Sequence, residues 1–271
     1  MKKKKWLIIS VVIFLMAFIC LGIAAWQIGS KKKAEDLNKE LKENFTENIE
    51  ETEQIELQET PAAEVTEEAV VTEKPKVEIP VNFDELHQIN SDIYAWIRIP
   101  DTAIDYPVVQ SPSDNTFYLN HASDRSASFP GAIFSENFNT TDFEDYLTVL
   151  YGHNMKDGSM FAGLHRYKDE QYLKEHNEIF IYTPDAIRKY KIFAAYRSDN
   201  RHLLYYYNSG ENPEDRIRFL DDIREQRSMC YYMDPELEID EEDKILTLST
   251  CDSAGDDYRF LVQASLQEVI Q

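Results

Sequence analysis

Two alternating segments near the C-terminus constrain the fold of this chain most. Residues 245–251 read Ile-Leu-Thr-Leu-Ser-Thr-Cys, and their period of two places successive side chains on opposite faces of a predicted strand. A turn rich in Gly and Asp follows, and residues 258–266 alternate again. We therefore predict two neighbouring antiparallel strands, which would bring Arg259 back beside Cys251.

This pairing leaves two roles open for Cys251. A thiolate is a nucleophile, and the permanent charge of a neighbouring guanidinium favours the thiolate over the thiol. Alternatively, Cys251 is a small apolar residue of the core, as most free cysteines are. The predicted hairpin alone does not separate these two interpretations.

Short strand-like runs, separated by Pro, Gly, Asn or Asp, precede the hairpin and make eight strands with it. Such a succession predicts a mainly β fold, either an antiparallel barrel or a sandwich, with few short helices. One helix should follow Asn82, and a second should start at Pro213 with Ile217, Leu220 and Ile223 on one face. The other predicted strands are 94–99, 106–110, 132–135, 146–151, 178–182 and 188–196.

An uncharged, mostly apolar run extends from Trp6 to Ile28, directly after four lysines. Its length suffices for a helix that spans a bilayer, which needs about 20 residues. A cleaved signal peptide is the alternative, but the run is long for a signal core and no A-x-A site follows it. We interpret residues 6–28 as one transmembrane anchor, residues 1–5 as a cytoplasmic tail and the remainder as extracellular.

Residues 29–79 are predicted to be an acidic, flexible linker. Between residues 34 and 79 there are 15 acidic and four basic side chains, and the apolar surface is too small to offset the entropy of ordering. As a coil this segment would reach roughly 40 Å. Leu37, Leu41, Phe45 and Ile49 nevertheless recur every four residues, which allows a helical extension of the anchor or a weak self-association stripe.

Residues 80–271 have the length of one ordinary domain and can bury a sizeable core. The whole chain carries 50 acidic and 28 basic side chains, a net charge of −22. Nucleic acid is therefore not an expected partner, because its recognition needs a basic face.

His153 is the third candidate for chemistry, since it follows Gly152 directly where a predicted apolar strand ends. Histidine exchanges protons near neutral pH. His121, in a loop, is the competing candidate. Together, Cys251, His153 and Arg259 would supply a nucleophile, a proton carrier and an oxyanion partner. Three further histidines lie in polar surroundings and should be solvated: His165, His176 and His202.

These motifs resemble those of the sortase family, and the resemblance covers about residues 82–269. It rests on T-L-S-T-C at 247–251, on an Arg eight residues later, and on Y-G-H-N-M-x-x-G-S-M-F at 151–161. The anchor and linker also suit sortases, which are mostly tethered to the outer face of Gram-positive membranes. Further matches resemble class B: W-I-R-I-P at 96–100, Y-P-V-V-Q at 106–110, D-N at 114–115 with Y-L at 118–119, G-A-I-F at 131–134, and the helix at 213–228 ahead of the Cys strand.

The resemblance implies an eight-stranded sortase-type β-barrel and a cysteine transpeptidase that needs no cofactor and no metal. Cys251 would attack the Thr carbonyl of a C-terminal sorting motif, broadly N-P-x-T-x, and form a thioester. His153 would protonate the departing amine, and Arg259 would hold the substrate and stabilise the oxyanion. A peptidoglycan amine, or alternatively a pilin lysine, would then resolve the thioester and attach the surface protein.

The same resemblance makes four residues candidates for the motif pocket: Asn115, Leu119, Ser249 and Asp252. Each also has a structural interpretation. Asn115 would make a turn, Leu119 would belong to the core, and the other two would satisfy local hydrogen bonds.

Cysteine usage and three other protein classes bear on this interpretation. A Cys230–Cys251 disulfide would abolish the chemistry, and the sequence does not exclude it. A papain-like hydrolase places its Cys early with a glycine-rich signature, whereas here His153 precedes Cys251. A metal site would need clustered ligands such as C-x-x-C, which the sequence lacks. A non-enzymatic surface adhesin would share the anchor, linker and β domain.

Overall fold

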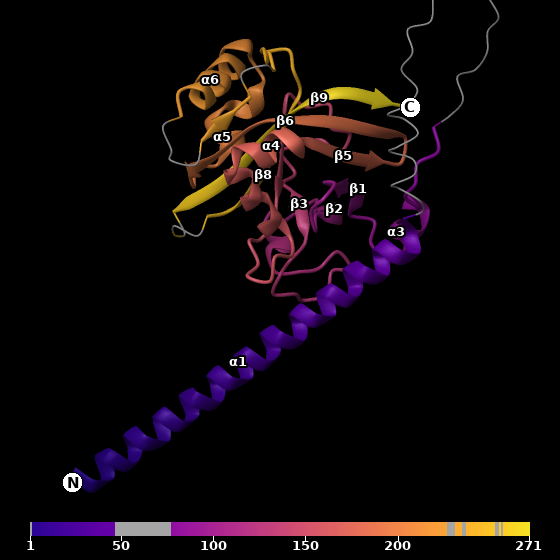
Figure 1. Cartoon of the computed structure of the whole chain (residues 1–271). Coiled ribbons are helices and arrows are strands. Elements are labelled where there is room, and N and C mark those ends of the chain that lie inside the picture. The colour runs from indigo at the N-terminus through magenta and orange to yellow at the C-terminus, as the bar shows by residue number, and fades with distance from the viewer. Residues whose placement is uncertain (1, 47–76, 227–230, 235–236, 253–254, 256) are drawn as a thin grey trace, which may run out of the picture.

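Eight strands close into a β-barrel in the computed structural model, which describes residues 2–46, 77–226, 231–234, 237–252, 255 and 257–271 (Figure 1). Their order around the barrel is β5-β1-β2-β3-β4-β8-β9-β6, and β6 pairs back onto β5. This closure confirms the predicted barrel and rules out the sandwich, which was its alternative. The strands are β1 (Ile93–Arg98), β2 (Asp105–Gln110), β3 (Ile133–Ser135), β4 (Leu147–Tyr151), β5 (Glu178–Thr183), β6 (Ala186–Asp199), β8 (Ile245–Cys251) and β9 (Tyr258–Ile270).

The strand directions differ in part from a purely antiparallel barrel. The predicted hairpin of β8 and β9 is confirmed, with Cys251 opposite Arg259. However, β2 pairs with β3 and β4 pairs with β8 in parallel. Parallel neighbours need a long crossover, and between β4 and β8 the chain passes through most of the remaining elements. The parallel pair places the C-terminal ends of β4 and β8 at the same end of the barrel.

Short helical elements and one short strand surround the barrel. Helix α6 (Pro213–Arg224) buries Phe219, Leu220 and Ile223 against the barrel wall. Ile217, which was expected on that face, is 43% exposed, because the buried face is rotated toward Phe219. The other elements are α3 (Phe83–Ile89), η1 (Phe117–Leu119), η2 (Phe161–Lys168), α4 (Glu170–Glu175), α5 (Leu203–Tyr206), η3 (Asn208–Gly210) and β7 (Tyr232–Met233).

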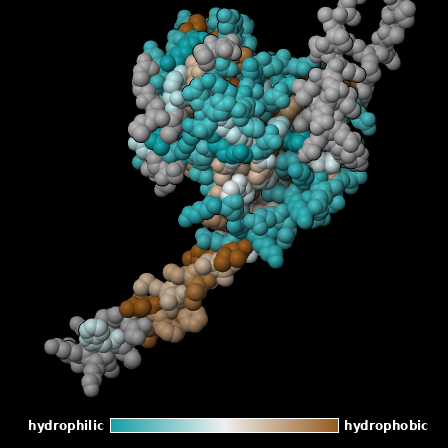
Figure 2. All heavy atoms as spheres, viewed as in Figure 1, coloured by the Kyte–Doolittle hydropathy of each residue, from teal (hydrophilic) through white to brown (hydrophobic). Residues whose placement is uncertain are grey.

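Helix α1 (Lys2–Phe45) is continuous through the predicted end of the anchor. Its apolar part stands clear of the domain (Figure 2) and is the one helix among the described residues with the length and composition to cross a membrane. Its C-terminal part packs on the barrel, where Leu41 is 1% exposed and lies in a cluster with Val81 and Phe83.

This docked part differs from the flexible linker that we predicted from residue 29. The stripe of Leu37, Leu41 and Phe45 explains the difference, because these side chains find an apolar partner on the barrel. The backbone N–H of Asn82 also donates to the carbonyl of Phe45 at 2.9 Å. Ile49, the last member of the predicted stripe, lies outside the described residues.

Candidate active site

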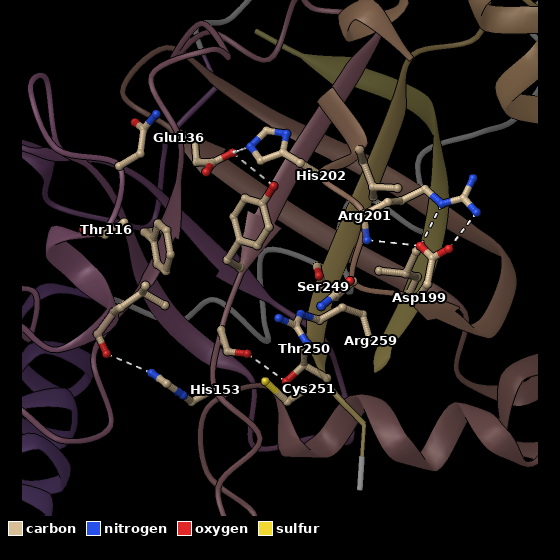
Figure 3. A pocket seen from close by; sticks show the side chains of 18 residues that line it. Thr116, Glu136, His153, Asp199, Arg201, His202, Ser249, Thr250, Cys251 and Arg259 are labelled. Carbon is tan, nitrogen blue, oxygen red and sulfur yellow. Dashed lines mark hydrogen bonds and ion pairs between the residues drawn. The ribbon is translucent and has the colours of Figure 1, made fainter. Parts of the chain in front are cut away.

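A cavity of about 250 Å³ opens at the barrel end where β4 and β8 stop and β9 starts (Figure 3). The ends of these strands form one side, which we call the strand wall: residues 151–153, 249–251 and Arg259. Loops and the ends of adjacent elements form the other side, the loop wall: Asn115, Thr116, Leu119, Glu136 and residues 199–203. Six of the seven predicted site residues line this cavity: Asn115, Leu119, His153, Ser249, Cys251 and Arg259.

Cys251 and Arg259 reach the cavity because of the register of the hairpin. Cys251 is the last residue of β8 and pairs with Arg259 across the ladder. Its thiol is free and exposed, which contradicts a buried core role. The Arg259 side chain points into the same cavity (Figure 3) and also donates from Nη1 to the Tyr258 carbonyl at 3.0 Å. Cys230, the suggested disulfide partner, lies outside the described residues.

His153 is held level with Cys251 by the parallel pair of β4 and β8. The N–H of Gly152 donates to the Ser249 carbonyl at 3.2 Å. In return, the Thr250 hydroxyl donates to the Gly152 carbonyl at 2.7 Å. Gly152 is required here, because a Cβ atom would lie 2.6 Å from the side chain of Ile133 and 2.7 Å from Phe161.

The imidazole of His153 contacts the loop wall in this structure. Its Nε2 lies 2.8 Å from the carbonyl oxygen of Leu119, and a carbonyl only accepts, so Nε2 carries a proton. Figure 3 shows that this edge of the ring is turned away from Cys251. Leu119 itself is 43% exposed, so the interpretation of Leu119 as a core residue is wrong.

Two residues that sequence reasoning missed bind the carbonyl of Cys251. Asn154 donates from Nδ2 at 3.0 Å, and His165 lies with Nε2 at 3.1 Å. His165 was expected to be solvated, yet it is half-buried, and burial together with Lys168 lowers its pKa. The neutral ring therefore donates from Nε2 at neutral pH. The sequence did not indicate this contact, because His165 reaches Cys251 only through the way in which η2 folds back toward the end of β8.

Asp252 is the one predicted pocket residue that does not line the cavity. Its side chain is fully buried and pairs with Lys168 at 3.0 Å and with Arg197 at 3.2 Å. The alternation of the strand explains this placement, because the residue after Cys251 points to the opposite face. Asp252 therefore braces the strand end from behind the cavity.

Side-chain contacts organise the loop wall. The carboxylate of Glu136 lies 2.7 Å from His202 Nε2 and accepts from the Tyr151 hydroxyl at 3.1 Å. Burial and the Glu136 charge raise the pKa of Tyr151, so the hydroxyl stays protonated and donates. His202, expected to be solvated, thus belongs to the cavity. His121, the competitor of His153, stacks on Phe117 with the ring centroids 3.9 Å apart and does not line the cavity.

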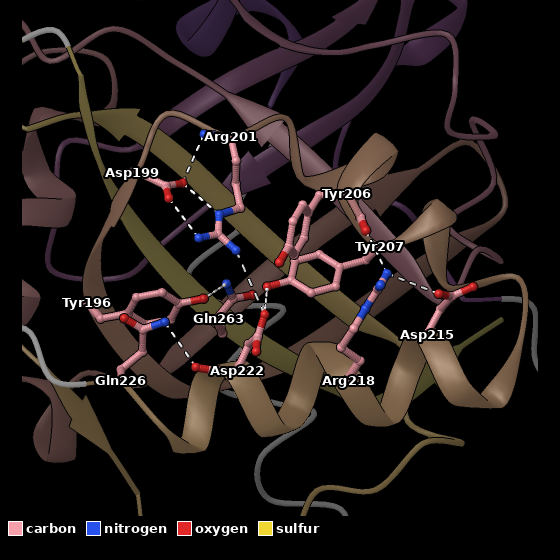
Figure 4. A network of polar contacts seen from close by, with 10 residues as sticks. All are labelled: Tyr196, Asp199, Arg201, Tyr206, Tyr207, Asp215, Arg218, Asp222, Gln226 and Gln263. Carbon is pink, nitrogen blue, oxygen red and sulfur yellow. Dashed lines mark hydrogen bonds and ion pairs between the residues drawn. The ribbon is translucent and has the colours of Figure 1, made fainter.

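Helix α6 supports one end of the loop wall through the polar network of Figure 4. Arg201 binds both carboxylate oxygens of Asp199 at 2.7 Å. Its guanidinium also lies 3.8 Å from Asp222 of α6, which accepts from the Tyr207 hydroxyl at 2.7 Å. The loop after β6 is therefore tied to a helix that packs on the barrel.

Comparison with known proteins identifies the family. Residues 97–267 match the model of the Sortase domain. A protein described as Sortase B from Listeria monocytogenes is 37% identical over 172 residues, which are 64% of this chain and 68% of that protein. The structure of Clostridium perfringens sortase B superposes with a TM-score of 0.60 at 30% identity and covers 69% of this chain and all of that one.

A Staphylococcus aureus sortase B–substrate complex gives a similar result. Its TM-score is also 0.60 at 30% identity, with 69% of this chain and 84% of that one covered. The domain match, the named relatives and the closed barrel agree with one another. The chain thus belongs to the sortase family of cysteine transpeptidases, and its relatives place it in class B.

Proposed function

We propose that this sortase cleaves a C-terminal sorting motif of the N-P-x-T-x type after Thr and transfers the surface protein to a peptidoglycan amine. The observation that carries the proposal is the cavity shared by Cys251, His153 and Arg259. A solved relative, the sortase B from Staphylococcus aureus, is described as a complex with a substrate.

The first half of the reaction would form a thioester. The Cys251 thiolate attacks the Thr carbonyl carbon, and the charge that develops on the carbonyl oxygen is stabilised by the Arg259 guanidinium. The C–N bond then breaks, and protonated His153 gives its proton to the departing amine. Since the Nε2 edge of His153 is bonded to Leu119, the ring has to turn, or use Nδ1, to reach the leaving group.

The second half of the reaction would transfer the acyl group. The acceptor amine attacks the thioester carbonyl, the C–S bond breaks, and Cys251 leaves as the thiolate. Neutral His153 takes the proton that the amine loses, which restores the starting state. Asn115, Leu119 and Ser249 would contact the motif, because they line the same cavity.

Peptide cleavage tests this proposal directly. The purified full chain is incubated with N-P-x-T-x peptides, with and without triglycine, and product masses separate hydrolysis from transfer. Cys251→Ala should abolish both products, whereas Cys20→Ala, a matched removal of the other free thiol among the described residues, should retain them. Cleavage by Cys251→Ala would overturn the proposed nucleophile.

The acceptor is the second variable of the same assay. A pilin lysine is the alternative to a peptidoglycan amine, so a lysine-containing pilin peptide is offered in competition with triglycine. The dominant product identifies the acceptor class. A chain from which no peptide is ever cleaved would favour a purely adhesive domain instead.

We further propose that α1 anchors the protein in the cell membrane, with residues 1–5 in the cytoplasm, residues 6–28 in the bilayer and the catalytic domain, residues 80–271, outside the cell. The apolar run of α1 and the lysines that precede this run support this topology. Protease added to intact cells should remove the domain. Protection of the domain from protease would contradict the outward orientation.

A further inference from the structure

The contacts of α1 with the barrel start immediately after its apolar run. The hydroxyl oxygen of Ser30 accepts from the backbone N–H of Phe129 at 2.8 Å. Ser30 lies only two residues beyond Ile28, which is about 3 Å along a helix axis. The loop that carries Phe129 is therefore level with the end of the segment that would lie in hydrocarbon.

Ion pairs between α1 and the barrel domain hold the barrel next to the end of the apolar run. Lys31 pairs with Asp157, and Lys33 lies 3.7 Å from Asp124. Burial alone would raise the pKa of Asp157, but hydrogen bonds from Lys31 and Ser159 lower it to about 2. Asp157 therefore stays charged and keeps its partner at neutral pH.

No flexible segment separates the apolar run from these contacts. Helix α1 is uninterrupted from Lys2 to Phe45, and Ala34 and Leu41 are 4% and 1% exposed against the barrel. In Figure 1 the arrowhead of β8, which ends at Cys251, points toward the side on which the N-terminal part of α1 leaves the domain. A bilayer around the apolar run would thus face the active-site end of the barrel.

Phe129 has the chemistry of an interfacial residue. Its side chain is 42% exposed, and aromatic side chains are favoured at membrane surfaces. The polar zone between hydrocarbon and water is about 5 to 8 Å thick on each side of a bilayer, so a residue level with Ser30 lies within it. The lysines of α1 neutralise Asp124 and Asp157, which would otherwise disfavour contact with anionic lipids.

We infer that the Phe129 loop is a second lipid-contacting surface, which holds the barrel against the bilayer with the active-site end close to the membrane. This inference rests on the proposed anchoring by α1. The sulfur of Cys251 would then work near the membrane surface.

Fluorescence quenching by lipids tests this contact. The full chain is reconstituted into phosphatidylcholine vesicles whose acyl chains are brominated near the head group. In a Trp6→Phe, Trp26→Phe background, the fully buried Trp96 adds the same emission to every variant and is subtracted. Phe129→Trp should then be quenched several-fold more strongly than Val269→Trp. Val269 is a matched control, because it is 39% exposed and lies in β9 near the C-terminus, remote from the N-terminal part of α1 (Figure 1).

The native tryptophans separate the two ways of failing. In the unmodified chain, quenching of Trp6 and Trp26 reports insertion of α1. If these are quenched but Phe129→Trp and Val269→Trp are equally unaffected, anchoring stands and the second contact is wrong. If Trp26 is not quenched either, both are wrong. Adding Lys31→Ala to Phe129→Trp should reduce its quenching, and an unchanged value would refute the role of the ion pair.

Discussion

The two walls of the cavity are built by different interactions. Backbone pairing of β4, β8 and β9 fixes the strand wall, so the positions of His153, Cys251 and Arg259 depend on strand register. Side-chain contacts such as Glu136 with His202 hold the loop wall together. The three proposed catalytic residues thus lie on the wall that backbone pairing holds in place, whereas the loop wall depends on side-chain contacts.

The largest effect should follow from removing His153, the proposed proton carrier, from the strand wall. His153→Ala should lower kcat/KM by about 10² to 10⁴, because general acid–base catalysis contributes that much. Thermal stability should barely change, since His153 is exposed to the cavity. Initial rates of peptide cleavage measure the effect. His121→Ala is the control, and a similar loss in that variant would contradict the assignment of His153.

The support behind the strand wall should dominate stability. Asp252→Asn leaves Lys168 and Arg197 without their shared counter-ion, and breaking a buried pair removes about 3 kcal/mol or more of unfolding free energy. Urea denaturation of the full chain in detergent measures it. The control is Asp257→Asn, at an exposed residue nearby, which should change the unfolding free energy by less than about 0.5 kcal/mol. Equal effects would mean that Asp252 is not a brace.

A smaller loss of unfolding free energy should result from a substitution that crowds the space between the strands. Gly152→Ala forces a methyl group against Ile133 and Phe161, and overpacking of this kind removes about 1 to 3 kcal/mol of unfolding free energy. Peptide cleavage should fall as well, because His153 is the next residue. Gly163→Ala is the matched control, since its nearest neighbour would lie at 3.5 Å. A fully active, fully stable Gly152→Ala would show that the close packing is not needed.

A substitution in the loop wall should have the smallest effect on activity, and it should change KM rather than kcat. Glu136→Gln weakens one charge-assisted hydrogen bond to His202, worth about 1 kcal/mol, so KM should rise about fivefold with kcat unchanged. Glu268→Gln, exposed at the far end of β9, should leave both constants unchanged. A fall in kcat instead of a rise in KM would mean that Glu136 takes part in the chemical step. The two walls would then not differ in function.

Local periodicity predicted the strand wall well. Alternation on both sides of a short turn was sufficient to set Cys251 opposite Arg259, and the glycine at the end of a strand pointed to His153. The parallel pairing of β4 with β8 was not predictable in this way, because it depends on how the long intervening chain folds back. The resemblance to sortases supplied the closed barrel instead.

The sequence was less informative about long-range contacts of side chains. His165 and His202 have polar sequence neighbours and were predicted to be solvated, but tertiary folding brings one to the Cys251 carbonyl and the other to Glu136. The family resemblance suggested Asp252 for the pocket, but the alternation of the strand turns its side chain to the opposite face, behind the cavity. The stripe containing Leu41 indicated a helical extension of the anchor, yet composition favoured a linker.

The junction between α1 and the barrel has a practical consequence. Thr46 forms a β-bridge with Val81, so the two ends of the intervening acidic segment lie side by side. The length of that segment does not determine how far the barrel lies from the apolar part of α1. An epitope tag or a reporter domain inserted there should leave the catalytic geometry undisturbed.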